Sequence, residues 1–136
     1  MTDPSTSEGW LDVARERGAD ARAMLPEREK SVGPAYMAGY AVEGALKAYL
    51  QAQGIPRPTS GPAGHDLAAL FKAAGLRLQD LNDSEGHAAF FLSDWSTALR
   101  YQAHKPDDMR GFGSLALVEA AGRLVGLLTA RIKRRR

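Results

Sequence analysis

The stretch AYMAGYAVEGALKAYLQAQ, residues 35–53, contains only two charged side chains, Glu43 and Lys47. An amphipathic surface helix normally keeps a broad polar face opposite its apolar stripe. Here alanine, tyrosine, valine and leucine occur on every side of the expected helix, so almost no such face is left. The pattern predicts a helix that is buried on more than one side, at the centre of a helical bundle.

Glu43 and Lys47 are spaced i,i+4 with the acidic residue first, which is the favourable order for an ion pair on a helix. On a mostly buried helix such a pair is costly unless both charges are satisfied. Two interpretations therefore stay open for the pair: a structural contact inside the bundle, or part of a functional site.

Length and composition restrict the class of protein. The chain has 136 residues, enough for one domain, residues 1–136, whose core needs no disulfide or structural metal. It contains no cysteine, which excludes thiol nucleophiles and cysteine-ligated zinc. The segment MTDPSTSEGW does not resemble a signal peptide, and no apolar run reaches the length of a membrane span. We therefore expect a cytoplasmic protein with no membrane contact and no cofactor.

The positive charge is concentrated in the last six residues, RIKRRR (131–136), five of which are Lys or Arg. The formal net charge is +2, but without these five the chain carries 13 basic and 16 acidic residues. A basic cluster can attract phosphates or a membrane surface. The simpler interpretation is a solvated helix C-terminus, where cations are favourable, rather than a dedicated nucleic-acid arm.

Hydrophobic periodicity and helix-breaking residues predict an all-α fold, an antiparallel up-and-down bundle of four long helices plus a short helix. Pro26 should end the first helix, Gly54 should cap the second, and Pro106 should end the fourth. About residues 7–132 should be structured. The expected helices are 7–25, 32–53, 65–74, 84–102 and a last helix that starts at 107 or 114 and ends near 135, with a loop at 54–64 and a turn or single helical turn at 76–82.

The expected helix 84–102 has an inward side and a polar side. The inward side consists of Phe91, Trp95, Ala98, Leu99 and Gln102. Arg100 and His104 share another face if the helix continues that far.

Most enzyme motifs are missing from the sequence, including those of phosphate-binding loops, zinc proteases and serine hydrolases. His65, His87 and His104 fall in different elements and show no metal-ligand spacing. No metal site is therefore expected, and a lone histidine is more often structural than a ligand.

Arg100 and His104 lie about one helical turn apart. A guanidinium can grip a phosphate with two hydrogen bonds, and an imidazole can take or give the proton of a 2′-hydroxyl near neutral pH. These two groups suffice for RNA cleavage without a metal. Spacing alone favours a plainer alternative, in which Arg100 pairs with Asp94 or another helix carboxylate.

Three short segments resemble the HEPN domain family, the higher eukaryote and prokaryote nucleotide-binding domain. They are AGYAVEGALKAYL (38–50), GHDL (64–67) and WSTALRY (95–101), and their order and spacing fit small bacterial members. The resemblance extends from about Trp10 to Ile132, nearly the whole chain. It implies an antiparallel helical bundle that usually forms a homodimer or pairs with another HEPN domain. Many members are metal-independent endoribonucleases in toxin–antitoxin pairs (often beside a nucleotidyltransferase), phage defence or RNA processing.

The active site of the family is an Arg followed by four to six residues and a His, with two copies meeting in a cleft at the dimer interface. Carried over, Arg100 and His104 would be these residues, with Glu43 and Lys47 ordering the floor of the groove. Only three residues separate Arg100 from His104, and Tyr101 stands where active members commonly have Asn, Asp or His. The hypotheses are an endoribonuclease, a non-catalytic HEPN module that binds a nucleotide, an RNA or a protein partner, and a helical interaction protein whose basic tail contacts acidic partners.

Overall fold

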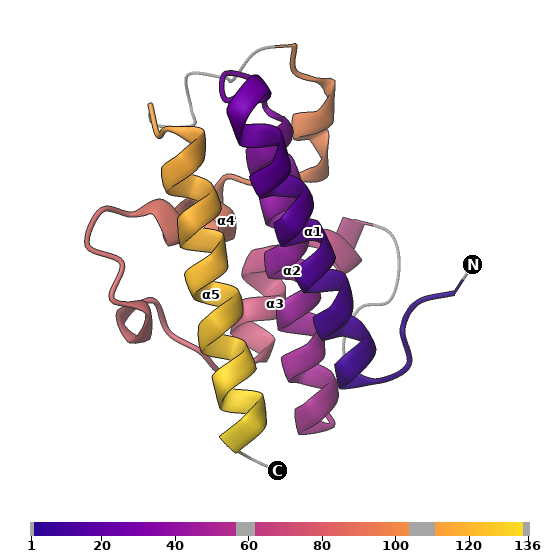
Figure 1. Cartoon of the computed structure of the whole chain (residues 1–136). Coiled ribbons are helices and arrows are strands. Elements are labelled where there is room, and N and C mark those ends of the chain that lie inside the picture. The colour runs from indigo at the N-terminus through magenta and orange to yellow at the C-terminus, as the bar shows by residue number, and fades with distance from the viewer. Residues whose placement is uncertain (1, 57–61, 104–110, 135–136) are drawn as a thin grey trace.

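The computed structural model describes residues 2–56, 62–103 and 111–134, and this part of the chain contains five α-helices and no strand. The predicted all-α class is confirmed. The helices are α1 (Ser7–Arg28), α2 (Gly33–Gln53), α3 (Leu67–Ala73), α4 (His87–Ser93) and α5 (Ser114–Arg134), with the short 3-10 helices η1 (Pro62–His65), η2 (Leu78–Leu81) and η3 (Thr97–Tyr101) between them. α1 runs antiparallel to α2 and α5, and α2 contacts both of these helices as well as α3 (Figure 1).

α2 lies at the centre of the bundle, as its sequence predicts. Fourteen of its 21 residues are buried, so it has no broad solvated face. α1 lies close to α2 at Gly44, where an added Cβ would lie 3.1 Å from the backbone nitrogen of Ala14 and 3.2 Å from the carbonyl oxygen of Trp10. Only the smallest residue leaves room for two helix backbones to pack at this distance.

The ends of α2 also agree with the sequence. Pro34 lies in the first turn, where its missing N–H removes no helical hydrogen bond. Gly54 caps the C-terminus in the left-handed conformation, with φ of 70°, and its N–H donates to the carbonyl of Gln51.

Pro26 does not end α1, so this part of the prediction is wrong. The helix continues to Arg28 with Pro26 inside it. A proline within a helix removes one donor but need not stop the chain from turning. The end of α1 is tied instead to α5, because the hydroxyl of the buried Ser114 donates to the carbonyl of Glu29.

The predicted long helix 84–102 is also wrong, because the segment forms the short α4 and the separate η3. Both carboxylate oxygens of Asp83 accept from the first turn of α4, from the N–H of Ala88 and of Ala89, each at 2.9 Å. Ser96 then starts η3 by accepting from the N–H of Ala98 at 3.2 Å. Local capping of this kind competes with a continuous helix. The bundle therefore has three long helices and two short ones instead of four long helices and one short helix.

The break at residues 94–96 changes which side chains face the core. Phe91, Trp95 and Leu99 are buried as predicted, but Ala98 and Gln102 are exposed. Arg100 consequently belongs to η3 rather than to the end of a long helix.

The remaining elements follow the sequence closely. Asp66 is the N-cap of α3 and accepts from the N–H of Ala69 at 3.1 Å, and η2 is the expected single turn. α5 begins at Ser114, the later of its two predicted starts, and the basic residues Arg131, Lys133 and Arg134 belong to its last turn. None of the described helices is long and apolar enough to cross a membrane.

Candidate functional site

Arg100 presents its guanidinium at the surface of η3. Its Nη2 donates to the hydroxyl of Tyr101 at 2.9 Å, and the guanidinium carbon lies 4.8 Å from the centre of the Tyr101 ring. The hydroxyl of Tyr101, and after it that of Tyr36, raises the pKa of Arg100 above its ordinary value, so the group stays charged. Tyr101 itself is 74 % exposed. An exposed cation beside an exposed aromatic ring can contact a phosphate and a base together.

The alternative in which Arg100 pairs with Asp94 is not found, since Arg100 makes no ion pair with a carboxylate of the described residues. Asp94 is exposed and lies at the C-terminal end of α4, where its backbone N–H donates to the carbonyl of Phe90 at 2.8 Å. The charge of Arg100 is thus not neutralised by this part of the chain.

A line of polar side chains, the α2 polar stripe, runs along one face of α2 toward the interior. Its members are Tyr36, Tyr40, Glu43 and Lys47. The hydroxyls of Tyr36 and Tyr40 lie 3.0 Å apart, and the two rings pack edge to face. Burial, and then the hydrogen bond with Tyr36, raises the pKa of Tyr40 above its ordinary value, so its phenol keeps its proton.

Trp95 packs against the two tyrosines of this stripe. Its ring stacks on Tyr36 with 6.2 Å between centroids and meets Tyr40 edge to face at 5.3 Å. Gly39 makes this packing possible, because a Cβ there would lie 1.9 Å from Cε2 of Trp95. The Trp95 Nε1–H is buried and has no hydrogen-bond partner among the residues that the structure describes. The break between α4 and η3 therefore inserts an aromatic wedge against α2 and carries Arg100 to the end of the stripe.

Glu43 and Lys47 are buried, as predicted, and Nζ of Lys47 lies 3.2 Å from Oε2 of Glu43. Lys47 also lies over the ring of Trp10, at 4.9 Å from its centre. The other oxygen of the carboxylate, Oε1, lies 2.7 Å from Nδ1 of His65. The pair thus belongs to a cluster of three residues, Glu43, Lys47 and His65, and its role in a site stays a prediction.

His65 is the group that sequence reasoning missed. The segment Gly-His-Asp-Leu carries part of the family resemblance, but His65 was interpreted as a lone histidine because the three histidines fall in different elements. Its partner Glu43 is 22 residues away in the sequence. A usable signal was the helical repeat on α2, since Tyr36, Tyr40, Glu43 and Lys47 follow one another at spacings of three or four residues. Polar side chains that are buried need hydrogen-bond partners, so this stripe predicts a polar residue from elsewhere in the chain beside it.

His104 lies outside the described residues, so the structure gives no distance from Arg100 to this predicted partner. Among the predicted site residues, Glu43 with Lys47 and Arg100 with Tyr101 are each in contact. After burial and Tyr36, the charge of Glu43 further raises the pKa of Tyr40, and the charge of Arg100 lowers it.

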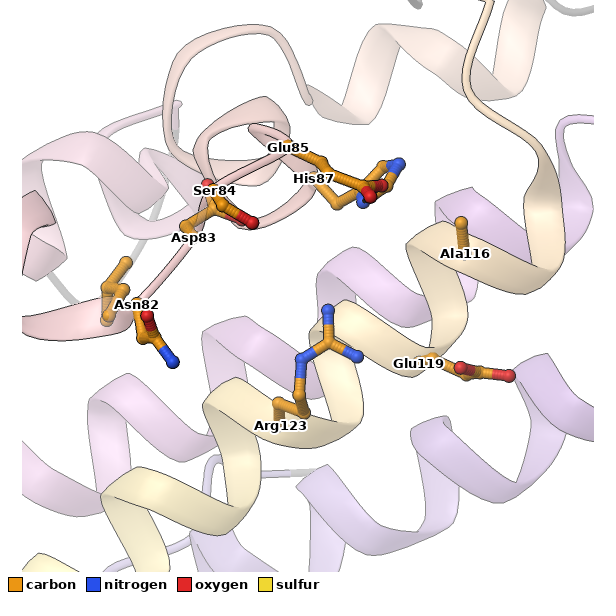
Figure 2. Close-up of a pocket in the computed structure, with 9 residues that line it drawn as sticks. Asn82, Asp83, Ser84, Glu85, His87, Ala116, Glu119 and Arg123 are labelled. Atoms are coloured by element: carbon orange, nitrogen blue, oxygen red, sulfur yellow. Dashed lines mark ion pairs between the residues drawn. The ribbon is translucent and has the colours of Figure 1, made fainter.

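A second polar region, the α5 groove, lies between α5 and the loop before α4 and has a volume of about 510 Å³. Figure 2 shows Arg123 extending from α5 into the space below Asp83 and Ser84. Both carboxylate oxygens of Asp83 cap α4, and Oε2 of Glu85 lies 3.6 Å from Nδ1 of His87. Glu43, Lys47, Asp94, Arg100 and Tyr101, the predicted site residues within the described part of the chain, do not line this groove. In the described part of the chain no three His, Asp or Glu residues are grouped as a metal would require.

A comparison with protein-family models adds an independent finding. The model of the HEPN domain matches residues 7–125. No curated protein and no solved structure matches the chain significantly. The family match covers α1 to the middle of α5, including the α2 polar stripe, His65 and Arg100. The chain therefore belongs to the HEPN domain family.

Proposed function

We propose that this HEPN domain protein binds RNA and cleaves it without a metal ion, with Arg100 as the phosphate ligand and His104 as a proton-transfer group. The observation that carries the proposal is the state of Arg100, which is exposed, charged and free of any carboxylate partner in the described chain. The hydroxyl of Tyr101 restrains it, so less side-chain freedom is lost when it binds.

The chemistry follows from these roles. Two parallel hydrogen bonds from Arg100 to a phosphate would stabilise the negative charge that develops on its oxygens. The 2′-oxygen of the nucleotide whose 3′-oxygen carries this phosphate attacks the phosphorus as its proton passes to a base. The bond from phosphorus to the 5′-oxygen of the next nucleotide breaks as that oxygen takes up a proton. The products are a 2′,3′-cyclic phosphate and a free 5′-hydroxyl. Tyr101, which is 74 % exposed, offers a surface on which a base can stack.

A non-catalytic module that binds RNA, a nucleotide or a protein partner is the second candidate. The observation that favours it is the distance in sequence between Arg100 and His104, which is shorter than in active family members. Such a module would use Arg100 and Tyr101 in the same way but would leave the RNA intact.

We also propose that the protein acts as a homodimer, as HEPN domains commonly do, and that a nucleotidyltransferase-type antitoxin is its partner in a toxin–antitoxin or defence system. The apolar surface of α2 is not available for dimerisation, because α1, α3 and α5 cover it. A stable dimer would need about 800 Å² from each protomer. Light scattering at micromolar concentration should give twice the mass of one chain, and a monomer at high concentration would contradict the dimer.

The test of the function is incubation of a mixed RNA pool with the protein in EDTA. We expect cleavage by the wild type, loss of cleavage in Arg100→Ala, and unchanged cleavage in Arg15→Ala, which removes an exposed arginine paired with Asp12. Products with 2′,3′-cyclic ends would identify the 2′-hydroxyl as nucleophile. Binding without cleavage by the wild type would favour the second candidate, and neither binding nor cleavage would overturn both.

A further inference from the structure

Glu43 fixes the orientation and the tautomer of His65. Its Oε1 lies 2.7 Å from Nδ1, and its other oxygen is held by Lys47 at 3.2 Å, so the buried carboxylate cannot turn away. A neutral imidazole has one N–H, and a carboxylate beside Nδ1 keeps that proton there. The lone pair is then on Nε2.

The rest of the His65 ring is open to a ligand. The side chain is 41 % exposed, whereas that of Glu43 is buried. Nε2 has no hydrogen-bond partner among the described residues, although Nδ1 has a strong one. A buried carboxylate behind an exposed imidazole is the arrangement that stabilises the imidazolium when the ring accepts a proton.

His65 and Arg100 lie along the same aromatic surface of α2. The His65 ring meets the Tyr40 ring edge to face with 6.0 Å between centroids. Tyr40 shares a hydrogen bond with Tyr36, and the Tyr36 hydroxyl, after that of Tyr101, raises the pKa of Arg100. Tyr40 and Tyr36 are one helical turn apart, so a nucleotide held by Arg100 would extend along the tyrosines toward His65.

We infer that His65, positioned by Glu43, is the group that accepts the 2′-hydroxyl proton at the Arg100 site, an inference that rests on the proposed function. Displacement at phosphorus needs a base for the attacking oxygen and an acid for the leaving oxygen. If the site contained a single histidine, that histidine would have to act as both the base and the acid. With His65 as base, the 2′-oxygen bonds to phosphorus as its proton passes to Nε2, and the bond from phosphorus to the 5′-oxygen of the next nucleotide breaks as that oxygen takes a proton from water.

The decisive variant is His65→Gly, because it leaves a space in which free imidazole can bind. Loss of a positioned proton acceptor should lower the cleavage rate about 10²–10⁴-fold, and added imidazole should restore a measurable part of it. The matched control is His87→Gly, since His87 lies at the start of α4 beside Phe112 and Glu85. It should cleave like the wild type. Full activity of His65→Gly would overturn the inference and leave the role of Arg100 intact.

A second measurement does not depend on turnover or on the folding of a variant. Nitrogen-15 NMR of histidine-labelled wild type should show His65 with its proton on Nδ1, and the Nε2 signal should move when uridine 3′-monophosphate is added. The movement should disappear in Arg100→Ala. If the nucleotide shifts the signals of Tyr101 but not those of His65, the inference is wrong. If it shifts neither and the wild type cleaves nothing, the proposed function fails, and His65 has no role in it.

Discussion

The α2 polar stripe and the α5 groove differ in how their polar groups are used. The groove is spacious, but both oxygens of Asp83 are occupied by the backbone of α4, and Glu85 and Glu119 are exposed. The stripe is narrow, yet it joins buried charges to exposed groups at two points, His65 and Arg100. A catalytic or binding site needs polar groups that are held in a fixed position and still have free hydrogen-bonding capacity for a ligand. By that criterion the stripe, and not the larger cavity, is the candidate site.

The largest loss of stability should come from removing the buried ion pair of Glu43 and Lys47 in the α2 polar stripe. Lys47→Ala leaves Glu43 with a buried charge and, among the described residues, His65 as its one remaining side-chain partner. The free energy of unfolding should therefore fall by about 3–5 kcal/mol. Arg17→Ala removes an exposed ion pair with Asp20 and should lower it by about 0–1 kcal/mol. Urea denaturation compares the two variants. Equal midpoints would show that the buried pair does not stabilise the fold.

A smaller effect is expected where the stripe contacts Trp95. Gly39→Ala places a methyl group on the indole, and overpacking of this kind typically destabilises by about 1–3 kcal/mol. Gly126→Ala is the matched control, because nothing lies within 4 Å of its added Cβ and alanine is the better helix former, by about 0.5–1 kcal/mol. Thermal unfolding should therefore move in opposite directions in the two variants. A shift of the same sign would mean that Trp95 does not pack as described.

The smallest change in stability is expected for substitutions in the α5 groove. If Asp83 serves only as the cap of α4, Asp83→Ala should lower stability by about 1 kcal/mol and leave RNA cleavage unchanged. Glu85→Ala, at an exposed neighbour, should change stability by less than about 0.5 kcal/mol. A loss of cleavage in Asp83→Ala with little loss of stability would indicate that the catalytic site lies in the α5 groove.

The fold was largely predictable because its determinants are local in the sequence. The uninterrupted apolar character of α2, the proline in its first turn and the glycine after it define the central helix without any knowledge of its partners. The break after α4 was not predictable from periodicity, since Phe91, Trp95 and Leu99 continue a helical repeat across it. There the side chains of Asp83 and Ser96 decide the structure by capping short helices.

The candidate site was predictable only in part. The spacing of Glu43 and Lys47 indicates their contact, because both lie on one helix. Two other contacts, Glu43 with His65 and Trp95 with Tyr36, join residues that are far apart in the sequence. They depend on the path by which the later segments come back to α2, and no local sequence pattern predicts that path. Arg100 was singled out together with His104 from their chemistry and spacing, and the resemblance to the family motif then favoured this interpretation over a plain ion pair.

The most direct test of the central claim is the affinity for single-stranded RNA of two variants that each remove one arginine. Arg100→Ala should weaken binding and lower the dependence of log Kd on log salt by about one, as expected when one phosphate contact is lost. Arg123→Ala, in the α5 groove, should bind like the wild type at every salt concentration. Weaker binding by Arg123→Ala, with Arg100→Ala unchanged, would contradict the account.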